Sequence, residues 1–118
     1  DQFSESELHL LKHGRHFRIN ADAKIVVGRT KQDNEQMERY VDLSSEMLLK
    51  VRNRPGPLVV IPNGADRDTV LLAASLCAGY SKAPVDMPVQ VNVVSSKGRE
   101  SVTVLPIAPR TVSNYLIS

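Results

Sequence analysis

Cationic side chains with a strand-like spacing are the residues of this chain best suited to chemistry. Lys50, Arg52 and Arg54 alternate with Val51 and Asn53. Because successive side chains of an extended segment point to opposite faces, the three cations are expected on one side. Lys and Arg heads bind phosphate oxygens, and the planar fork of Arg can make two such bonds at once. The pattern predicts a phosphate-binding surface, with solvated surface charge as the plainer alternative.

The charge of the chain is distributed in blocks that its total conceals. Fifteen Lys and Arg against thirteen Asp and Glu give a formal charge of only +2. Residues 9–31 are nevertheless strongly basic, with all three His and a single acid, Asp22. Their six cations are Lys12, Arg15, Arg18, Lys24, Arg29 and Lys31. Residues 33–46 invert the sign, with Arg39 as their only cation. A chain of low net charge can therefore still present a basic face.

The three histidines form the one cluster with a metal-like spacing. His9 and His13 are four residues apart, and such a pair on a helix can hold one ion. Lys12 and Arg15 would repel a cation, and His16 is expected to lie beyond the helix. Solvated or phosphate-facing imidazoles are therefore favoured over a metal site.

Signals for catalysis are weak. Cys77 lies among Leu, Ala and Val, which favours packing in the core over the exposed thiolate that a nucleophile requires. Ser75 and Ser81 lack the surroundings of a nucleophile elbow, and no glycine-rich phosphate loop occurs. The chain itself is predicted to be non-catalytic and to hold no metal or cofactor.

The elements that would position these side chains follow from periodicity and capping. Ser4 or Ser6 can cap a short N-terminal helix, Thr30 a helix over about 31–42, and Asp66 a buried helix that continues to about residue 80. Strands are expected over 16–19, 23–27, 46–51, 58–61, 89–94, 101–105 and 111–117. The segment 58–61 is apolar on both faces and should be central. The order ββαββαβββ, after the short N-terminal helix, predicts an α+β domain with a mixed or antiparallel sheet and two main helices.

Length and composition fit one domain. The chain has 118 residues and 42% hydrophobic residues, enough for a core without disulfides. No apolar run approaches the ~18 residues of a membrane span, and the start, residues 1–5, has no signal-peptide core. We expect residues 1–7 to be a linker remnant of a longer parent chain, residues 8–118 to be the domain, and the location to be cytoplasmic.

Short motifs in a fixed order give the chain a family resemblance. Gly28-Arg29 is followed by Asn34-Glu35, and Arg15-His16-Phe17-Arg18 precedes them on the first expected strand. Pro55-Gly56 forms a turn, and Tyr80-Ser81-Lys82-Ala83 ends the apolar helix that contains Ala73-Ala74. Val89-Gln90-Val91 opens the next strand. Together these motifs resemble the NFACT-R domain, the RNA-binding module of ribosome quality-control proteins.

Two departures from the family pattern are informative. Lys50 and Leu58 stand where the family has histidines, and the lysine- and glycine-rich C-terminal loop of the family is replaced by a hairpin return over 99–109. The chain is in this respect similar to divergent members appended to the C-terminus of PP-loop enzymes that transfer sulfur to a uridine of tRNA. The resemblance implies a partner RNA, tRNA or another structured RNA, and an upstream catalytic domain of the same chain that uses ATP.

The residues expected to contact RNA combine cations with two glycines that let the backbone approach a phosphate. They are Arg15, Arg18, Gly28, Arg29, Lys31, Lys50, Arg52, Arg54 and Gly56. With five aromatic residues and no Trp, recognition by shape and backbone is favoured over base stacking. A protein-interaction module that docks on its parent enzyme through the acidic 33–46 segment remains the alternative, and completion of an upstream catalytic site is a third possibility.

Overall fold

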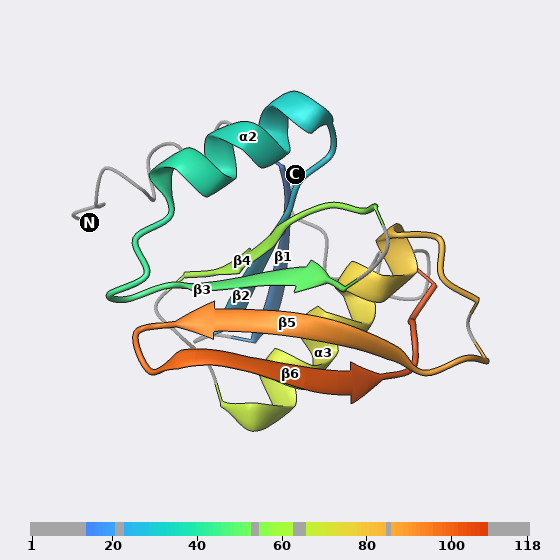
Figure 1. The fold of residues 1–118 in the computed structure, drawn as a ribbon. Coiled ribbons are helices and arrows are strands. Elements are labelled where there is room, and N and C mark those ends of the chain that lie inside the picture. Colours follow the sequence, from blue (N-terminus) through green and yellow to red (C-terminus); the bar gives the residue numbers. More distant parts are fainter. Residues whose placement is uncertain (1–13, 21–22, 53–54, 63–65, 85, 109–118) are drawn as a thin grey trace.

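The described residues form an antiparallel sheet of six strands with one helix on each face (Figure 1). The computed structural model describes residues 14–20, 23–52, 55–62, 66–84 and 86–108. The elements are β1 (Arg15–Asn20), β2 (Ala23–Val27), α2 (Lys31–Tyr40), β3 (Met47–Val51), β4 (Val59–Ile61), α3 (Arg67–Tyr80), β5 (Val89–Ser95) and β6 (Gly98–Val104). The spatial order is β1-β2-β4-β3-β5-β6, and every neighbouring pair is antiparallel.

The predicted class and element order are confirmed for the described part of the chain. The order ββαββαββ agrees with the expectation through β6, and the sheet is the antiparallel of the two forms considered. Helix α2 ends at Tyr40, two residues before the predicted end, because Val41 adopts an extended conformation. The expected N-terminal helix and the last strand over 111–117 lie outside the described residues.

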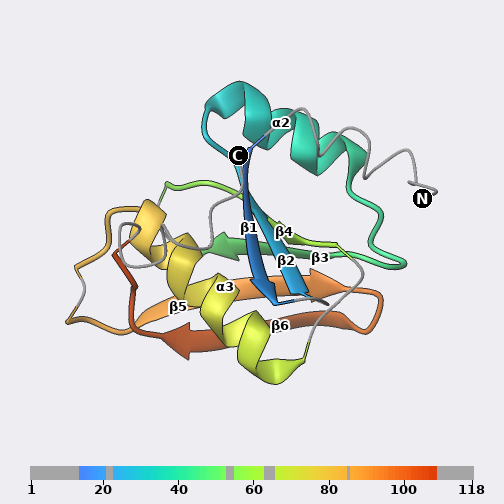
Figure 2. The same cartoon turned by 180° about the vertical axis from the view of Figure 1, so that it is seen from behind.

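The larger core lies between α3 and one face of the sheet. Ile25, Val27, Leu49, Val59 and Ile61 turn toward α3, and each of these side chains is fully buried. They occupy alternate positions of β2, β3 and β4, as the two-residue repeat of a strand requires. The apolar helix predicted from sequence therefore packs against the centre of the sheet (Figure 2).

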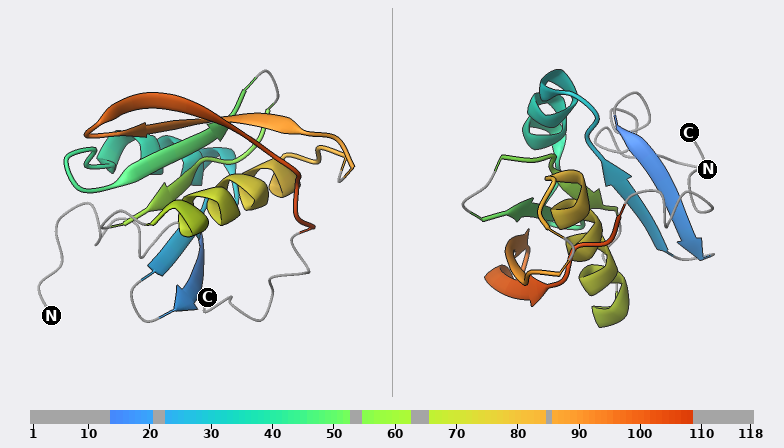
Figure 3. Two further views of the ribbon diagram at one scale, coloured as in Figure 1. Left: turned by 90° about the horizontal axis from the view of Figure 1, so that it is seen from below. Right: turned by 90° about the vertical axis from the view of Figure 1, so that its right-hand side faces the viewer.

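A smaller core fills the space under α2 on the opposite face. Met37 of α2 packs with Val26, Leu58 and Val60, and all four are buried. Val60 turns away from Val59 and Ile61, so β4 is buried on both faces, which confirms its predicted central place. Two further views show α2 and α3 on different sides of the sheet (Figure 3).

Both helices begin with the caps predicted from sequence. The Thr30 hydroxyl accepts a hydrogen bond from the Asp33 amide at 3.0 Å, and the Asp66 carboxylate accepts one from the Thr69 amide at 2.8 Å. Each cap satisfies one of the amides that a helix start leaves without a partner. None of the helices among the described residues is long and apolar enough to cross a membrane.

One end of the sheet brings together the termini of β1, β2, β3, β4 and α3. β1 begins at Arg15, which pairs with the last residue of β2, Val27. Val27 and the β3 residue Leu49 both pair with Val59, so β3 ends and β4 begins at this same end. A β-carbon at Gly56 would come within 2.5 Å of the Ser81 side chain, so the end of α3 lies there as well. Segments far apart in sequence therefore meet where α2 begins.

Candidate nucleic-acid interface

The turn from β2 into α2 is built around a close contact between Gly28 and Asn34. The Gly28 amide donates a hydrogen bond to the Leu58 carbonyl at 3.0 Å, and the Leu58 amide donates to the Asn34 side-chain oxygen at 3.1 Å. A β-carbon at Gly28 would lie 1.9 Å from that oxygen. Gly28 is thus required by packing, and the Asn34 amide holds the first turns of α2 against β4.

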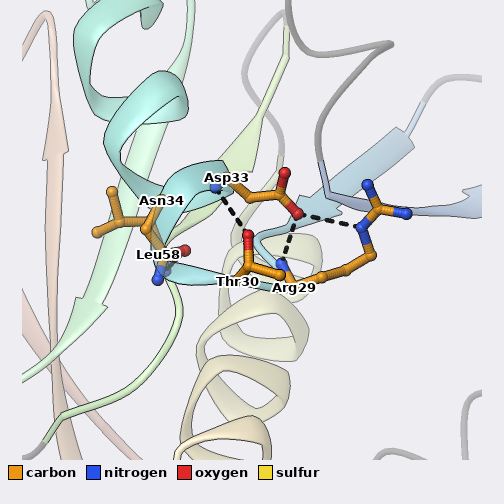
Figure 4. Close-up of polar contacts among 5 residues, drawn as sticks. All are labelled: Arg29, Thr30, Asp33, Asn34 and Leu58. Carbon is orange, nitrogen blue, oxygen red and sulfur yellow. Dashed lines mark hydrogen bonds and ion pairs between the residues drawn. The ribbon is translucent and has the colours of Figure 1, made fainter.

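Arg29 is held in place by its own helix. Asp33 Oδ2 accepts hydrogen bonds from the Arg29 backbone amide at 3.1 Å and from Arg29 Nε at 3.0 Å (Figure 4). The Asp33 side chain is 7% exposed and that of Arg29 is 48% exposed. The two terminal nitrogens of the guanidinium point away from Asp33 (Figure 4). A partly immobilised guanidinium loses less freedom when it binds an anion.

A hollow of about 290 Å³ opens beside this turn and collects three of the predicted cations. Arg15 comes from β1, whereas Arg29 and Lys31 come from the start of α2. The complete lining is Arg15, Gly28, Arg29, Thr30, Lys31, Asn34, Pro57 and Tyr80. The positive end of the α2 dipole adds to the field of the three side chains. The arrangement suits a phosphate group or another anion.

Tyr80 is a site residue that the sequence does not reveal, because its place at the end of an apolar helix indicates packing in the core. Its hydroxyl accepts a hydrogen bond from Arg15 Nη1 at 3.3 Å, and the guanidinium carbon of Arg15 lies 5.4 Å from the centre of the Tyr80 ring. The ring is 6.4 Å from that of buried Phe17. The position of Tyr80 could have indicated its role, because it is the last residue of α3 and an aromatic ring at a helix end can reach beyond the core.

Two of the predicted cations, Lys50 on β3 and Arg52 directly after it, lie on the sheet face opposite α3. Lys50 and Arg52 are exposed on either side of buried Val51, as their alternation predicts. Arg52 Nη1 donates to the Gln90 side-chain oxygen at 3.2 Å. Arg54 lies outside the described residues.

Two further predicted residues have different surroundings. Arg18 pairs with Lys24 near the β1–β2 turn, toward the end of the sheet remote from the hollow. Gly56 faces the Ser81 side chain, so its missing side chain makes room for the end of α3. The structure thus brings Arg15, Arg29 and Lys31 together with Gly28, and it leaves Arg18 apart.

The remaining chemical candidates lie in the interior or outside the described residues. Cys77 is fully buried, with Sγ 3.4 Å from the Pro57 carbonyl oxygen, and burial raises the pKa of its thiol to about 12. His16 is 3% exposed and belongs to β1, beyond the expected helix. His9 and His13 lie outside the described residues. The described part of the chain holds no group of three or more potential metal ligands.

Comparison with known families identifies the family of this domain. Residues 14–116 match the family described as the NFACT protein RNA binding domain. The chain belongs to this family. An RNA-binding, non-catalytic role follows from that membership, and the resemblance of the short motifs is confirmed at the family level.

The fold is shared with a solved bacterial structure, and curated proteins give no match. The structure of the C-terminal of the fibronectin/fibrinogen-binding protein from Streptococcus suis aligns with a TM-score of 0.74 at 21% sequence identity. The alignment covers 89% of this chain and 49% of that chain, so this chain spans about half the length of its structural neighbour. The comparison with curated proteins found no match.

Proposed function

We propose that this domain binds tRNA, or another structured RNA, through phosphate contacts at the hollow, and that it presents this RNA to a catalytic PP-loop domain of the same protein. The observation that carries the binding site is the meeting of Arg15, Arg29 and Lys31 around one hollow. ATP and the sulfur-transfer chemistry belong, in this proposal, to the PP-loop domain.

The three cations of the hollow differ in how firmly they are held, and this difference supports phosphate binding. Arg29 is oriented by Asp33 and Arg15 by Tyr80, whereas no contact of Lys31 is seen among the described residues. Two oriented guanidinium groups suit the fixed geometry of phosphate oxygens, and a flexible ammonium adapts to the next phosphate. Neutralising three phosphates predicts that the affinity falls by roughly 2–3 log units per log unit of salt.

The alternative is docking on the parent enzyme through the acidic segment. Fewer carboxylates of this segment are exposed than its sequence indicates. Asp33 and Glu46 are 5% and 2% exposed. Asp33 binds Arg29, and Glu46 Oε1 accepts a hydrogen bond from the Asp42 amide at 2.7 Å. Glu35 and Glu38 remain exposed on α2. Much of the apparent acidic block thus serves local structure.

The binding half of the proposal is tested by titrating labelled tRNA with the wild-type chain, Lys31→Gln and the control Arg67→Gln. Arg67 carries the same charge and lies at the start of α3, about 20 Å along the helix from Tyr80. We expect Lys31→Gln to weaken binding about tenfold and Arg67→Gln to change it little. Equal affinities of all three proteins for tRNA would exclude the hollow as the site.

The proposed presentation of RNA to a PP-loop domain is tested in the proposed parent protein, with and without residues 14–116. We expect loss of the domain to raise the KM for tRNA and to leave tRNA-independent ATP use unchanged. A fall in the thermal stability of the parent with unchanged tRNA affinity would favour the docking alternative instead.

A further inference from the structure

We infer that the sheet face opposite α3 is a second RNA-binding surface, and that it takes the backbone of a double-helical stem. This inference rests on the proposed function, because it extends RNA binding beyond the hollow. We call the surface formed by Lys50, Arg52, Gln90, Asn92, Arg99 and Ser101 the open sheet face.

The strand register places these six side chains on one side. Val51, Val91, Val93 and Val102 are buried against α3, so their neighbours in sequence point to the other face. Lys50 pairs with Asn92, and Asn92 pairs with Ser101. The six residues therefore form a continuous area three strands wide, about 10 Å across.

Neither of the two described helices, α2 and α3, covers this part of the sheet. Helix α2 packs on Val26 of β2, on Val60 of β4 and on Leu58 directly before β4, and α3 lies on the far side. Figure 1 looks onto the uncovered strands β3, β5 and β6, with α2 above them. All six side chains of the open sheet face are exposed.

Arg99 was not predicted as a site residue, and the fold brings it to the same groove as Lys50. The groove has a volume of about 340 Å³ and runs beside α2, with Lys50, Asn92 and Arg99 among its lining. Glu38 is the only acid among the described residues that line it. Arg99 is followed by Glu100, which turns to the opposite face and pairs there with Arg67 at 3.2 Å. The open sheet face therefore carries a net positive charge complementary to a polyanion.

Hydrogen bonds between side chains orient the polar groups of this face. Ser101 Oγ donates to Asn92 Oδ1 at 2.8 Å, which leaves the Asn92 amide nitrogen directed to other partners. Arg52 is bonded to the Gln90 oxygen in the same way. Amide donors beside cations suit a partner that offers both hydroxyls and phosphates, and RNA offers both through its 2′-hydroxyl groups and its backbone.

The choice of a stem over a single strand comes from the aromatic residues. The described aromatic side chains are Phe17, Tyr40 and Tyr80, and none of them belongs to β3, β5 or β6. Single strands bind sheet faces by stacking their bases on aromatic rings, whereas an A-form helix is bound through phosphates and the 2′-hydroxyls of its shallow minor groove. The open sheet face carries cations and amides but no described aromatic ring, so its groups suit the phosphates and 2′-hydroxyls of an A-form helix.

The test compares Arg99→Gln with Arg67→Gln, which remove the same charge from opposite faces of the sheet. Each variant is titrated with a blunt RNA duplex of about 16 base pairs, one of its single strands, and the DNA duplex of the same sequence. We expect Arg99→Gln to weaken binding of the RNA duplex about tenfold, and Arg67→Gln less than twofold. Asn92→Ala should reduce the preference for the RNA duplex over the DNA duplex.

The outcomes separate this inference from the function on which it rests. If Arg99→Gln binds the duplex as tightly as wild type while Lys31→Gln loses tRNA affinity, the second surface is excluded and the hollow stands. Equal losses for duplex and single strand would overturn the choice of a stem. If the wild-type chain binds neither tRNA nor duplex at low salt, the proposed function fails, and the inference fails with it.

Discussion

The side-chain oxygen of Asn34 lies 1.9 Å from the place that a β-carbon on Gly28 would occupy, and this contact fixes how α2 begins. The same oxygen accepts the hydrogen bond of the Leu58 amide. Gly28 and Asn34 therefore act as one structural unit, which connects the end of β2, the start of α2 and the strand β4.

Gly28→Ala is expected to lower the free energy of unfolding by about 1–3 kcal/mol, because the new methyl group displaces Asn34 and leaves the part-buried Leu58 amide without its partner. Urea unfolding measures the change. Asn34→Ala removes the same hydrogen bond from the Leu58 amide, and it also removes the oxygen that a β-carbon at Gly28 would meet. The double variant should therefore be less destabilised than the sum of the two single variants, and strictly additive effects would show that the residues are independent.

Lys82 occupies a position where glycine is the usual residue. It has φ +65°, and the Lys82 and Ala83 amides donate to the Gly79 and Ala78 carbonyls, the bonding pattern of a helix that ends in a left-handed residue. Lys82→Gly should be more stable to urea than Lys82→Ala by about 1 kcal/mol, since both lose the charge and only Ala keeps the β-carbon strain. Equal midpoints for the two variants would contradict this account.

The thiol of Cys77 should be unreactive in the native protein. Burial raises its pKa to about 12, so almost none is thiolate at pH 8. We expect a thiol reagent to label Cys77 only at the rate of unfolding, and fast labelling to require denaturant. Rapid labelling of folded protein at pH 8 would show that the helix α3 opens more readily than its packing indicates.

Two exposed carboxylates should make stability depend on acid pH. The pKa of Asp66 is lowered by its hydrogen bond from Thr69, and that of Asp42 by its hydrogen bonds from Ser44. A folded-state pKa below the unfolded value of 3.8 adds stability that is present above pH 3.8 and is lost as pH falls through the folded pKa. Urea midpoints measured from pH 7 to pH 2 check this. Asp66→Asn keeps a capping oxygen without the charge, so its urea midpoint should change less with pH. A pH dependence equal to that of the wild-type chain would exclude Asp66 as a cause.

Local signals in the sequence were sufficient to predict the elements. The Thr30 and Asp66 caps, the apolar length of α3 and the alternation around Val51 depend on residues a few positions apart, and the structure agrees with each. Contacts between residues far apart in the sequence could not be predicted from such local signals. The insertion of β4 between β2 and β3, and the approach of Arg99 to Lys50, depend on strand pairing over many residues.

The acidic segment shows why charge alone misled about the surface. Asp33 and Glu46 belong to the acidic 33–46 segment that the sequence offers as a docking surface, but both turn inward to bind groups within four residues of themselves. A carboxylate near a helix start or a turn has backbone amides within reach, and these compete with water for it. Such acids neutralise local donors and contribute little to a docking surface.

The two arginines of β1 offer the sharpest test of the hollow. Both are exposed on one strand, but Arg15 lines the hollow and Arg18 lies toward the β1–β2 turn at the other end. Arg15→Gln should reduce the salt dependence of tRNA binding by roughly 0.7–0.9 log units per log unit of salt, the value of one phosphate contact. Arg18→Gln should leave the slope unchanged, because its charge is too far from a phosphate held at Lys31. Titrations of labelled tRNA between 50 and about 200 mM salt give both slopes. Equal reductions for Arg15 and Arg18 would mean that RNA follows the whole length of β1, and the hollow would then no longer define the site.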